Sequence, residues 1–162
     1  MKKKEFLKIA YQLNKKLNIM PLLFGSLGLE QRLTISLNAE DIDVLIPKEF
    51  INEKWQCIVD VMNDNGYTLY DYHEHAFEKD GLSLAYASIE SLTPFADIDI
   101  ANIPIINEDG IKYLLLELQD YLKVYTASSK DGYRKNVKNK QDKQKIDLIH
   151  NALSKNQYIK MP

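Results

Sequence analysis

Two short stretches decide the fold: Leu22-Leu23-Phe24-Gly25-Ser26 and, further along the chain, Asp41-Ile42-Asp43-Val44-Leu45-Ile46. Side chains at positions i and i+2 of a β-strand point to the same face, so Asp41 and Asp43 are expected to project together. The intervening apolar residues then occupy the other, buried face. Two carboxylates aimed at one point repel each other unless a cation, a proton or hydrogen-bond donors lie between them. The pair therefore predicts a platform for a divalent metal ion.

The Gly25-Ser26 pair, with Gly28 close behind, predicts a phosphate-binding turn after the first strand. Glycine lets the backbone approach a ligand closely, and a hydroxyl with free N–H groups can bind phosphate oxygens. Either feature alone is common in proteins. The ordered combination of buried strand, Gly-Ser turn, connection and acidic strand is much more specific.

The bulk composition predicts one compact domain in a reducing compartment. The chain has 162 residues, a net charge of −2 and a sequence pI of about 5.9. This balance argues against a protein dedicated to coating DNA, which is normally basic. The single Cys57 cannot form an internal disulfide, and no apolar run is long enough for a transmembrane helix. We therefore expect a cytoplasmic location and no membrane partner.

Hydrophobic spacing predicts an α/β (α+β) domain with a mixed sheet packed by helices on one side. We expect a single domain over residues 1–162, with a sheet-containing core to about residue 106 and a helical part from about 107. Residues 27–40 are expected to be a polar connection with a helical turn or an edge segment. The predicted helices are 3–18, 48–65, one that Asn107 caps and that runs to Tyr125, and a C-terminal one; the predicted strands are 21–24, 42–46, 67–72, 75–79, 82–88 and a segment near 97–100.

The two stretches quoted first resemble the nucleotidyltransferase superfamily, which includes DNA polymerase beta and the minimal and antibiotic-modifying nucleotidyltransferases. A weaker resemblance lies near the C-terminus, in Tyr133-Arg134-Lys135 followed by Lys140-Gln141-Asp142-Lys143. These resemble the basic, aspartate-containing helix start of the small abortive-infection and antibiotic-resistance members. The resemblance spans most of the chain, although it rests on few motif residues.

The resemblance implies a Mg²⁺-dependent transfer of a nucleoside monophosphate from a nucleoside triphosphate to a hydroxyl. Asp41 and Asp43 would hold two Mg²⁺ ions, while Gly25 and Ser26 would grip the β- and γ-phosphates. The basic run that contains Lys140 reads either as a solvated surface or as a phosphate or acceptor contact at the mouth of the site. The acceptor, whether a small molecule, a protein side chain or an RNA end, is left open.

The superfamily also needs a third carboxylate on a later strand, and here the sequence offers alternatives. The expected strand, 82–88, contains no acid. Glu90 lies just past it, and Asp99 follows further on, with Asp97 as a weaker choice. A further alternative is that none of these residues serves as the third carboxylate. The chain would then be a non-catalytic nucleotide-binding or toxin–antitoxin-type regulatory domain on the same scaffold, or a plain structural domain.

The segment His73-Glu74-His75 is a second cluster of polar groups. Two histidines at i and i+2 on a strand could share a zinc ion, but zinc needs further protein ligands. No other pair of cysteines or histidines in the sequence completes such a set. We therefore interpret this segment as an exposed part of a strand.

Overall fold

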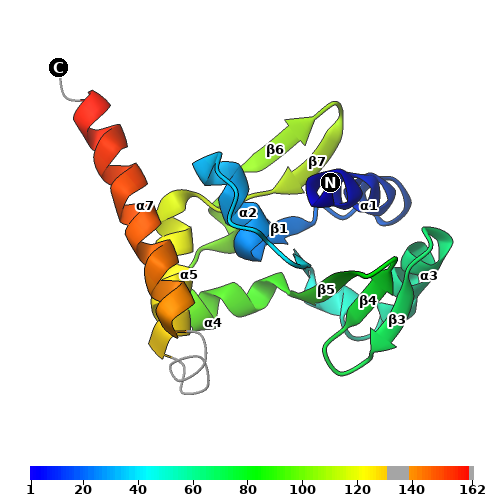
Figure 1. Ribbon diagram of the computed structural model, residues 1–162. Coiled ribbons are helices and arrows are strands. Elements are labelled where there is room, and N and C mark those ends of the chain that lie inside the picture. Colours follow the sequence, from blue (N-terminus) through cyan, green and yellow to red (C-terminus); the bar gives the residue numbers. More distant parts are fainter. Residues whose placement is uncertain (131–138, 161–162) are drawn as a thin grey trace.

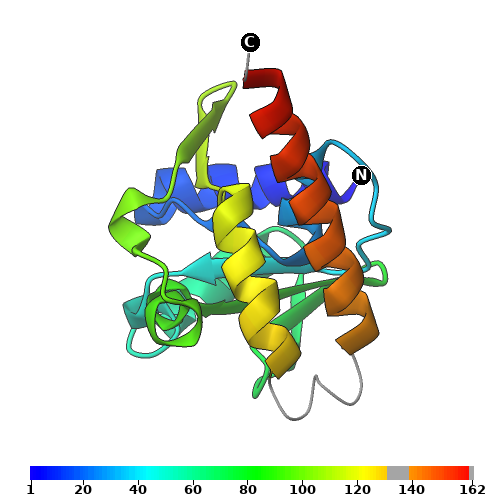
Figure 2. The same ribbon diagram turned by 90° about the vertical axis from the view of Figure 1, so that its left-hand side faces the viewer.

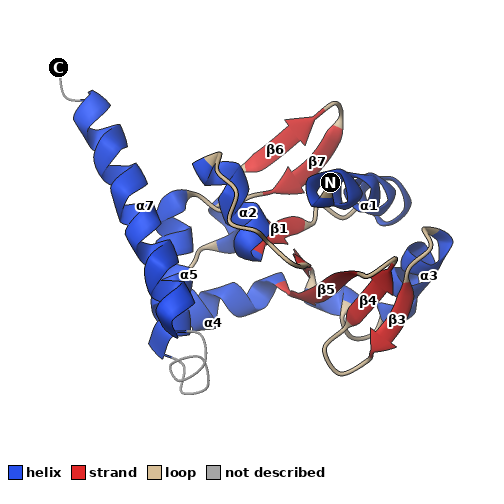
Figure 3. Cartoon of the chain, in the orientation of Figure 1, coloured by secondary structure: helices blue, strands red, loops and turns tan. Residues whose placement is uncertain are grey.

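The computed structural model describes residues 1–130 and 139–160, without the side chains of residues 139–140 and 156–160. In this part of the chain the strands form one seven-stranded mixed sheet, which lies between helices (Figures 1 and 3). The strands are β1 (Leu22–Phe24), β2 (Ile42–Ile46), β3 (Thr68–Asp71), β4 (Ala76–Lys79), β5 (Leu82–Ser88), β6 (Ile105–Glu108) and β7 (Ile111–Leu114).

The order of the strands places β1 and β2 near the centre of the sheet. The order is β3-β4-β5-β2-β1-β7-β6. The strand β2 runs antiparallel to β1 and parallel to β5, and β1 runs parallel to β7. The N-terminal end of β2 therefore lies beside the C-terminal end of β1.

The longer helices cover the sheet and the 3₁₀ turns connect the elements. The α-helices are α1 (Lys2–Leu17), α2 (Gly25–Leu33), α3 (Trp55–Asp64), α4 (Leu92–Ala96), α5 (Leu118–Lys130) and α7 (Asn139–Lys160). The 3₁₀ turns are η1 (Lys48–Phe50), η2 (Ile89–Ser91) and η3 (Ile100–Asn102). No helix in the described ranges is long and apolar enough to cross a membrane.

Helices pack on both faces of the sheet, so the expectation of helices on one side is wrong. Leu22 and Leu23 point to opposite faces of β1, and both side chains are 0% exposed. Leu23 belongs to one hydrophobic core together with Phe6 of α1 and buried residues of α3. Leu22 belongs to a second core with Tyr121 of α5 and buried residues of α4. Figure 2 shows α5 and α7 side by side over this second face.

The predicted fold class is confirmed, but several local predictions are wrong in the first two-thirds of the chain. The helix predicted over residues 48–65 begins only at Trp55, after η1, and residues 73–75 form a turn rather than part of a strand. Residues 25–33 form α2, where we expected a Gly-Ser turn followed, over residues 27–40, by a polar connection with a helical turn or an edge segment.

No strand forms near residues 97–100. Asp97 ends α4 in the left-handed conformation, with φ 55°, and Asp99 caps η3. At Asp99, short-range hydrogen bonding by the carboxylate competes with strand pairing, and at Asp97 the left-handed backbone conformation ends any extended segment.

The helix predicted from Asn107 begins only at Leu118. Residues 105–114 instead form the hairpin of β6 and β7, which turns at Asp109-Gly110. Both turn residues have positive φ, 53° and 87°, the conformation that two-residue hairpin turns require. The Asp-Gly pair was therefore a hairpin signal rather than the first turn of a helix.

Part-buried carboxylates tie α1 to the sheet. Glu108 of β6 accepts a hydrogen bond from Lys3 Nζ at 2.8 Å and another from the hydroxyl of the buried Tyr113. These hydrogen bonds, from Lys3 first and Tyr113 second, lower the pKa of the Glu108 carboxyl. Glu5 makes a similar link, since it accepts hydrogen bonds from Tyr67 and Lys79.

We expect the Lys3–Glu108 contact to make the free energy of unfolding depend on pH. A carboxyl whose pKa is lowered by folding stabilises the folded state at neutral pH, and this stabilisation is lost as the pH falls through the lowered pKa, below the ordinary 4.5. Glu108→Gln should therefore reduce the free energy of unfolding by about 1 kcal/mol near neutral pH, and by less at about pH 3. Urea titrations at the two pH values measure this difference.

The matched control is Glu53→Gln, because Glu53 is exposed and makes no hydrogen bond or ion pair within the described residues. It should leave the free energy of unfolding unchanged at both pH values. An equal loss for Glu108→Gln at both pH values would contradict the assignment.

Candidate functional site

The pairing of β1 with β2 brings the Gly-Ser turn and the acidic pair together. In the antiparallel register Phe24 lies opposite Asp43, so Gly25, the next residue, comes to lie beside the Asp43 carboxylate. Asp41 and Asp43 are exposed, whereas Ile42 between them is fully buried. The alternation predicted from the sequence is thus present in β2.

Gly25 is required at this position for two reasons. Its φ is +63°, in the left-handed region that disfavours residues with a side chain. A Cβ atom at this position would also lie 2.5 Å from Oδ2 of Asp43. A bare glycine therefore allows the carboxylate to approach the first turn of α2.

The start of α2 is held tightly against the sheet. Gly28 has no room for a side chain, because the Leu23 carbonyl and the Tyr121 hydroxyl lie directly against it. The Tyr121 hydroxyl donates a hydrogen bond to the Leu23 carbonyl at 3.0 Å. Burial raises the pKa of Tyr121, so the hydroxyl stays protonated and can donate. Gly28 thus serves helix packing, and the free N–H groups of the first turn of α2 begin at the Gly-Ser turn.

A loop fixed by Glu30 carries the chain from α2 back to the acidic pair. Glu30 Oε1 accepts hydrogen bonds from the backbone N–H groups of Leu37, at 2.8 Å, and Ala39, at 3.1 Å. The loop therefore folds back toward α2 before it enters β2. This positions Glu40 and Asp41 next to the start of α2.

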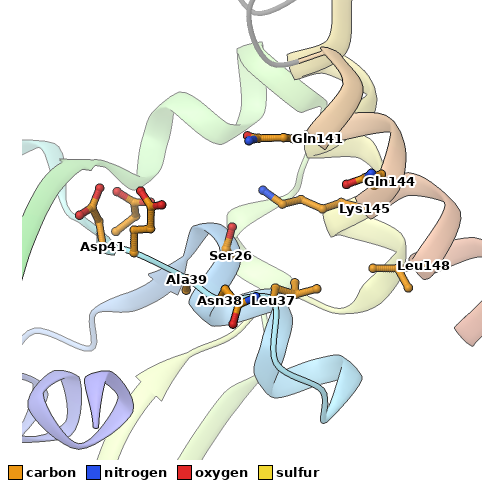
Figure 4. Close-up of a pocket in the computed structure, with 11 residues that line it drawn as sticks. Ser26, Leu37, Asn38, Ala39, Asp41, Gln141, Gln144, Lys145 and Leu148 are labelled. Atoms are coloured by element: carbon orange, nitrogen blue, oxygen red, sulfur yellow. The ribbon is translucent and has the colours of Figure 1, made fainter.

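A cavity of about 370 Å³ opens between the start of α2, the start of β2 and α7 (Figure 4). Figure 4 shows the Lys145 side chain reaching from α7 toward Ser26 and Asp41. The cavity thus has carboxylates at one end and a lysine with amide side chains at the other. We call it the main pocket; it is lined by Ser26, Leu37, Asn38, Ala39, Glu40, Asp41, Asp43, Gln141, Gln144, Lys145 and Leu148.

The contact of α7 with α5 determines which side chains of α7 face the main pocket. Asp142 is 0% exposed, and the Ser128 hydroxyl of α5 donates a hydrogen bond to it at 3.1 Å. Lys145 lies over the ring of Tyr125, with its Nζ 4.9 Å from the ring centroid. The predicted phosphate ligand Lys140 lies in α7, but its side chain is outside the described residues. Sequence reasoning did not single out Lys145, which lay among several lysines without a distinguishing signal.

The structure does not bring Glu90 to the acidic pair. Glu90 Oε1 accepts hydrogen bonds from the backbone N–H of Lys48, at 2.9 Å, and from the Ser88 hydroxyl, at 3.1 Å. Lys48 follows the C-terminal end of β2, whereas Asp41 precedes its N-terminal end. The length of β2 therefore separates Glu90 from the main pocket.

Asp99 does not complete the acidic pair either. Its carboxylate caps η3, where it accepts hydrogen bonds from Ala101 N at 3.1 Å and Asn102 Nδ2 at 2.6 Å. No three carboxylate, histidine or cysteine side chains in the described part of the chain are placed to share a metal ion. Glu40 lines the main pocket together with Asp41 and Asp43, but these three carboxylates are not placed to share one metal ion.

Alanine occupies the strand position next to the acidic pair. The parallel pairing of β5 with β2 sets Ala85 opposite Asp43, on the same face of the sheet. The sequence of β5, residues 82–88, contains no carboxylate. A third acid on the neighbouring strand is therefore absent from the place where it would meet Asp43.

The segment 73–75 connects β3 to β4 and lies beside a second cavity. This cavity has a volume of about 390 Å³, and Asp43 lines it as well as the main pocket. The imidazole of His75 packs edge-on against Trp55, with ring centroids 4.8 Å apart. The described residues do not place a third ligand near His73 and His75, so the zinc alternative gains no support.

Comparison with solved structures shows which class of fold this is. The chain superimposes on the crystal structure of ANT(2″)-Ia in complex with adenylyl-2″-tobramycin with a TM-score of 0.58, at 12% identity over 94% of this chain and 90% of that one. It also matches an antigenic nucleotidyltransferase-like protein from Paracoccidioides brasiliensis with a TM-score of 0.60, at 17% identity over 91% of this chain and 74% of that one. The fold is therefore nucleotidyltransferase-like, as the motifs predicted.

The sequence also identifies a family. It matches no family model. It is 47% identical over 149 residues to YnaI, an uncharacterized protein of Bacillus subtilis (strain 168), across 92% of this chain and 96% of the relative. The chain belongs to the same family as YnaI.

We predict that Gly25→Ala destabilises the fold more than the same change at Gly110. Gly110 also has positive φ, +87°, but a Cβ there would meet nothing within 4 Å. Gly110→Ala should therefore reduce the free energy of unfolding only by the cost of the left-handed conformation, about 1–2 kcal/mol. Gly25→Ala should reduce it by this amount and, in addition, by the cost of displacing Asp43. Urea unfolding of both variants measures the difference, and equal losses would show that Asp43 does not press against Gly25.

Proposed function

We propose that the main pocket binds the triphosphate of a nucleoside triphosphate with Mg²⁺, and that the chain transfers the nucleoside monophosphate to a hydroxyl. The observation that carries the proposal is the convergence of Ser26, the Asp41–Asp43 pair and Lys145 in one cavity. These groups come from three separate segments of the chain. A polyanion such as a triphosphate would fit these groups, because the carboxylates can bind a cation that contacts one part of it, and Ser26 and Lys145 can donate hydrogen bonds to another part.

The donor set around the acidic pair fits Mg²⁺. This ion prefers carboxylate and phosphate oxygens and retains several waters, so two protein carboxylates with a bound triphosphate are a sufficient ligand set. Asp41 and Asp43 would hold it. When bound, the metal would neutralise phosphate charge and favour ionisation of an attacking hydroxyl.

The other groups of the main pocket would orient the triphosphate. The N–H groups of the first turn of α2 and the Ser26 hydroxyl can donate to phosphate oxygens, and the helix dipole favours an anion there. Lys145 reaches toward the same point from α7 and adds positive charge (Figure 4). Gln141 and Gln144 supply further amide donors. Together they would align the α-phosphorus with an incoming hydroxyl, and such positioning is the main contribution of an enzyme to phosphoryl chemistry.

Ala85 supports a second candidate function, binding without turnover. Because alanine stands opposite Asp43 on β5, that strand contributes no third carboxylate to the pair, and no metal-sharing group of three is found in the described part of the chain. In this alternative the chain is a nucleotide-responsive regulatory domain, such as a toxin–antitoxin-type component. Both functions require that the main pocket binds nucleotide. Detection of pyrophosphate and of a nucleotide-linked product separates them.

We expect Mg²⁺ and a nucleoside triphosphate together to stabilise the chain against heat. A ligand at 100 times its dissociation constant adds about 2.7 kcal/mol to the free energy of unfolding. Asp43→Asn should abolish the Mg²⁺-dependent part of this gain. Glu90→Gln and Asp99→Asn serve as controls, because both carboxylates lie outside the main pocket, and these variants should keep the gain. An unchanged gain in Asp43→Asn would contradict the proposal.

We also expect Lys145 to contribute to triphosphate affinity. Lys145→Met keeps the packing of the side chain on Tyr125 but removes the charge, and it should weaken binding about tenfold, since charged hydrogen bonds contribute about 1.5–3 kcal/mol. Lys143→Met is the matched control, because Lys143 is on α7 but does not line the main pocket. Isothermal titration with Mg²⁺ and ATP measures both affinities. Equal affinities in the two variants would exclude Lys145 as a phosphate ligand.

A further inference from the structure

The second cavity lies next to the main pocket and shares one residue with it. Asp43 lines both cavities, so a molecule in the second cavity would lie beside a phosphate held in the first. Ala85 and Ala87 of β5 line the second cavity together with Phe24. Residues 73–75, between β3 and β4, line it as well. No residue of α7 lines this cavity among the described residues, and Asp43 is the one residue that it shares with the main pocket.

A hydroxyl that attacks a phosphorus atom must lose its proton, and a positioned base accelerates that step. Within the described residues, β5 offers no such base beside Asp43, because Ala85 occupies the paired position. The same alanine leaves room in the cavity for another molecule. A base that accepts the proton of the attacking hydroxyl would therefore come from an element other than β5.

Besides Asp43, the carboxylate that lines this cavity among the described residues is that of Glu74. Its backbone N–H donates a hydrogen bond to Asp71 Oδ1 at 3.1 Å, which fixes the turn between β3 and β4. Its side chain is exposed and has no hydrogen bond or ion pair within the described part of the chain. The ring of His75 is engaged with Trp55. A positioned glutamate carboxylate is one of the side chains that serve as general bases in enzymes.

We propose that Glu74 does the work of the acid missing from β5, and that the second cavity binds a small hydroxyl-bearing acceptor between Glu74 and Asp43. This inference rests on the proposed function. The acceptor oxygen forms a bond to the α-phosphorus, the bond from that phosphorus to the bridging oxygen breaks, and pyrophosphate leaves. The hydroxyl proton passes to the Glu74 carboxylate and then to water.

The size and lining of the cavity indicate the class of acceptor. A volume of about 390 Å³ is within the range of small-molecule sites. The alanines and Phe24 provide an apolar surface, and Glu74 can accept a hydrogen bond from a hydroxyl. These features suit a small alcohol or polyol rather than a macromolecular end.

The test measures pyrophosphate release from each of the four ribonucleoside triphosphates with Mg²⁺, using glycerol as the acceptor probe and mass spectrometry to detect glycerol-linked nucleotide. Glu74→Gln should lower product formation about 100-fold. Glu53→Gln, a change of the same kind at an exposed glutamate, should leave it unchanged. The double variant Glu74→Gln/Ala85→Asp should recover product, because it restores a carboxylate beside Asp43, whereas Glu74→Gln/Ala85→Asn should not.

Thermal stabilisation by Mg²⁺ with each of the four ribonucleoside triphosphates, measured without glycerol, separates failure of this inference from failure of the proposed function. All these variants should keep the stabilisation of the unaltered chain. Product formation that survives Glu74→Gln, or that His73→Asn abolishes instead, overturns the role of Glu74. Stabilisation without any product from the unaltered chain also overturns it. Absence of stabilisation in the unaltered chain refutes the proposed function itself.

Discussion

The register between β1 and β2 is the constraint on which the main pocket depends. Because Phe24 pairs with Asp43, the chain must turn into α2 beside a carboxylate, and only a glycine with positive φ fits there. The turn and the acidic pair are therefore one structural unit. A slip of one residue would turn the carboxylates of β2 into the core and expose its apolar residues, at a large hydrophobic cost.

The far side of the main pocket is set by a different kind of interaction. A buried carboxylate is costly unless its oxygens are satisfied, so the hydrogen bond from Ser128 to Asp142 favours one placement of α7 on α5. Residues 141, 144, 145 and 148 follow helical spacing and face the main pocket as one stripe. Asp142 of the C-terminal motif thus acts through packing, and Lys145, one turn later, lines the main pocket.

The sequence predicted what depends on local pattern and missed what depends on distant contacts. Period-two alternation predicted β2 and the shared orientation of Asp41 and Asp43, and the strands predicted over 75–79 and 82–88 are present as β4 and β5. The first turn of α2 was missed because Gly25 and Ser26 are weak helix formers, and packing against Leu23 and Tyr121 overrides that preference. The Asp109-Gly110 hairpin was misread because its acidic residues also suit a helix start.

The search for a third carboxylate shows the same limit. Glu90 and Asp99 were reasonable choices along the chain, but only strand pairing reveals that Ala85 occupies the neighbouring position. Likewise, no local pattern connects residues 73–75 with Asp43. The sequence could therefore define the acidic pair and the turn, whereas the partners contributed by β5, α7 and the loop after β3 required the tertiary structure.

A crystal structure of the chain with Mg²⁺ and a non-hydrolysable nucleoside triphosphate analogue is the most direct measurement of the central claim. We predict that the triphosphate lies between Asp41–Asp43 and Lys145, with phosphate oxygens at the first turn of α2 and the metal on the acidic pair. A nucleotide bound elsewhere, or phosphates oriented away from that turn, would contradict the account.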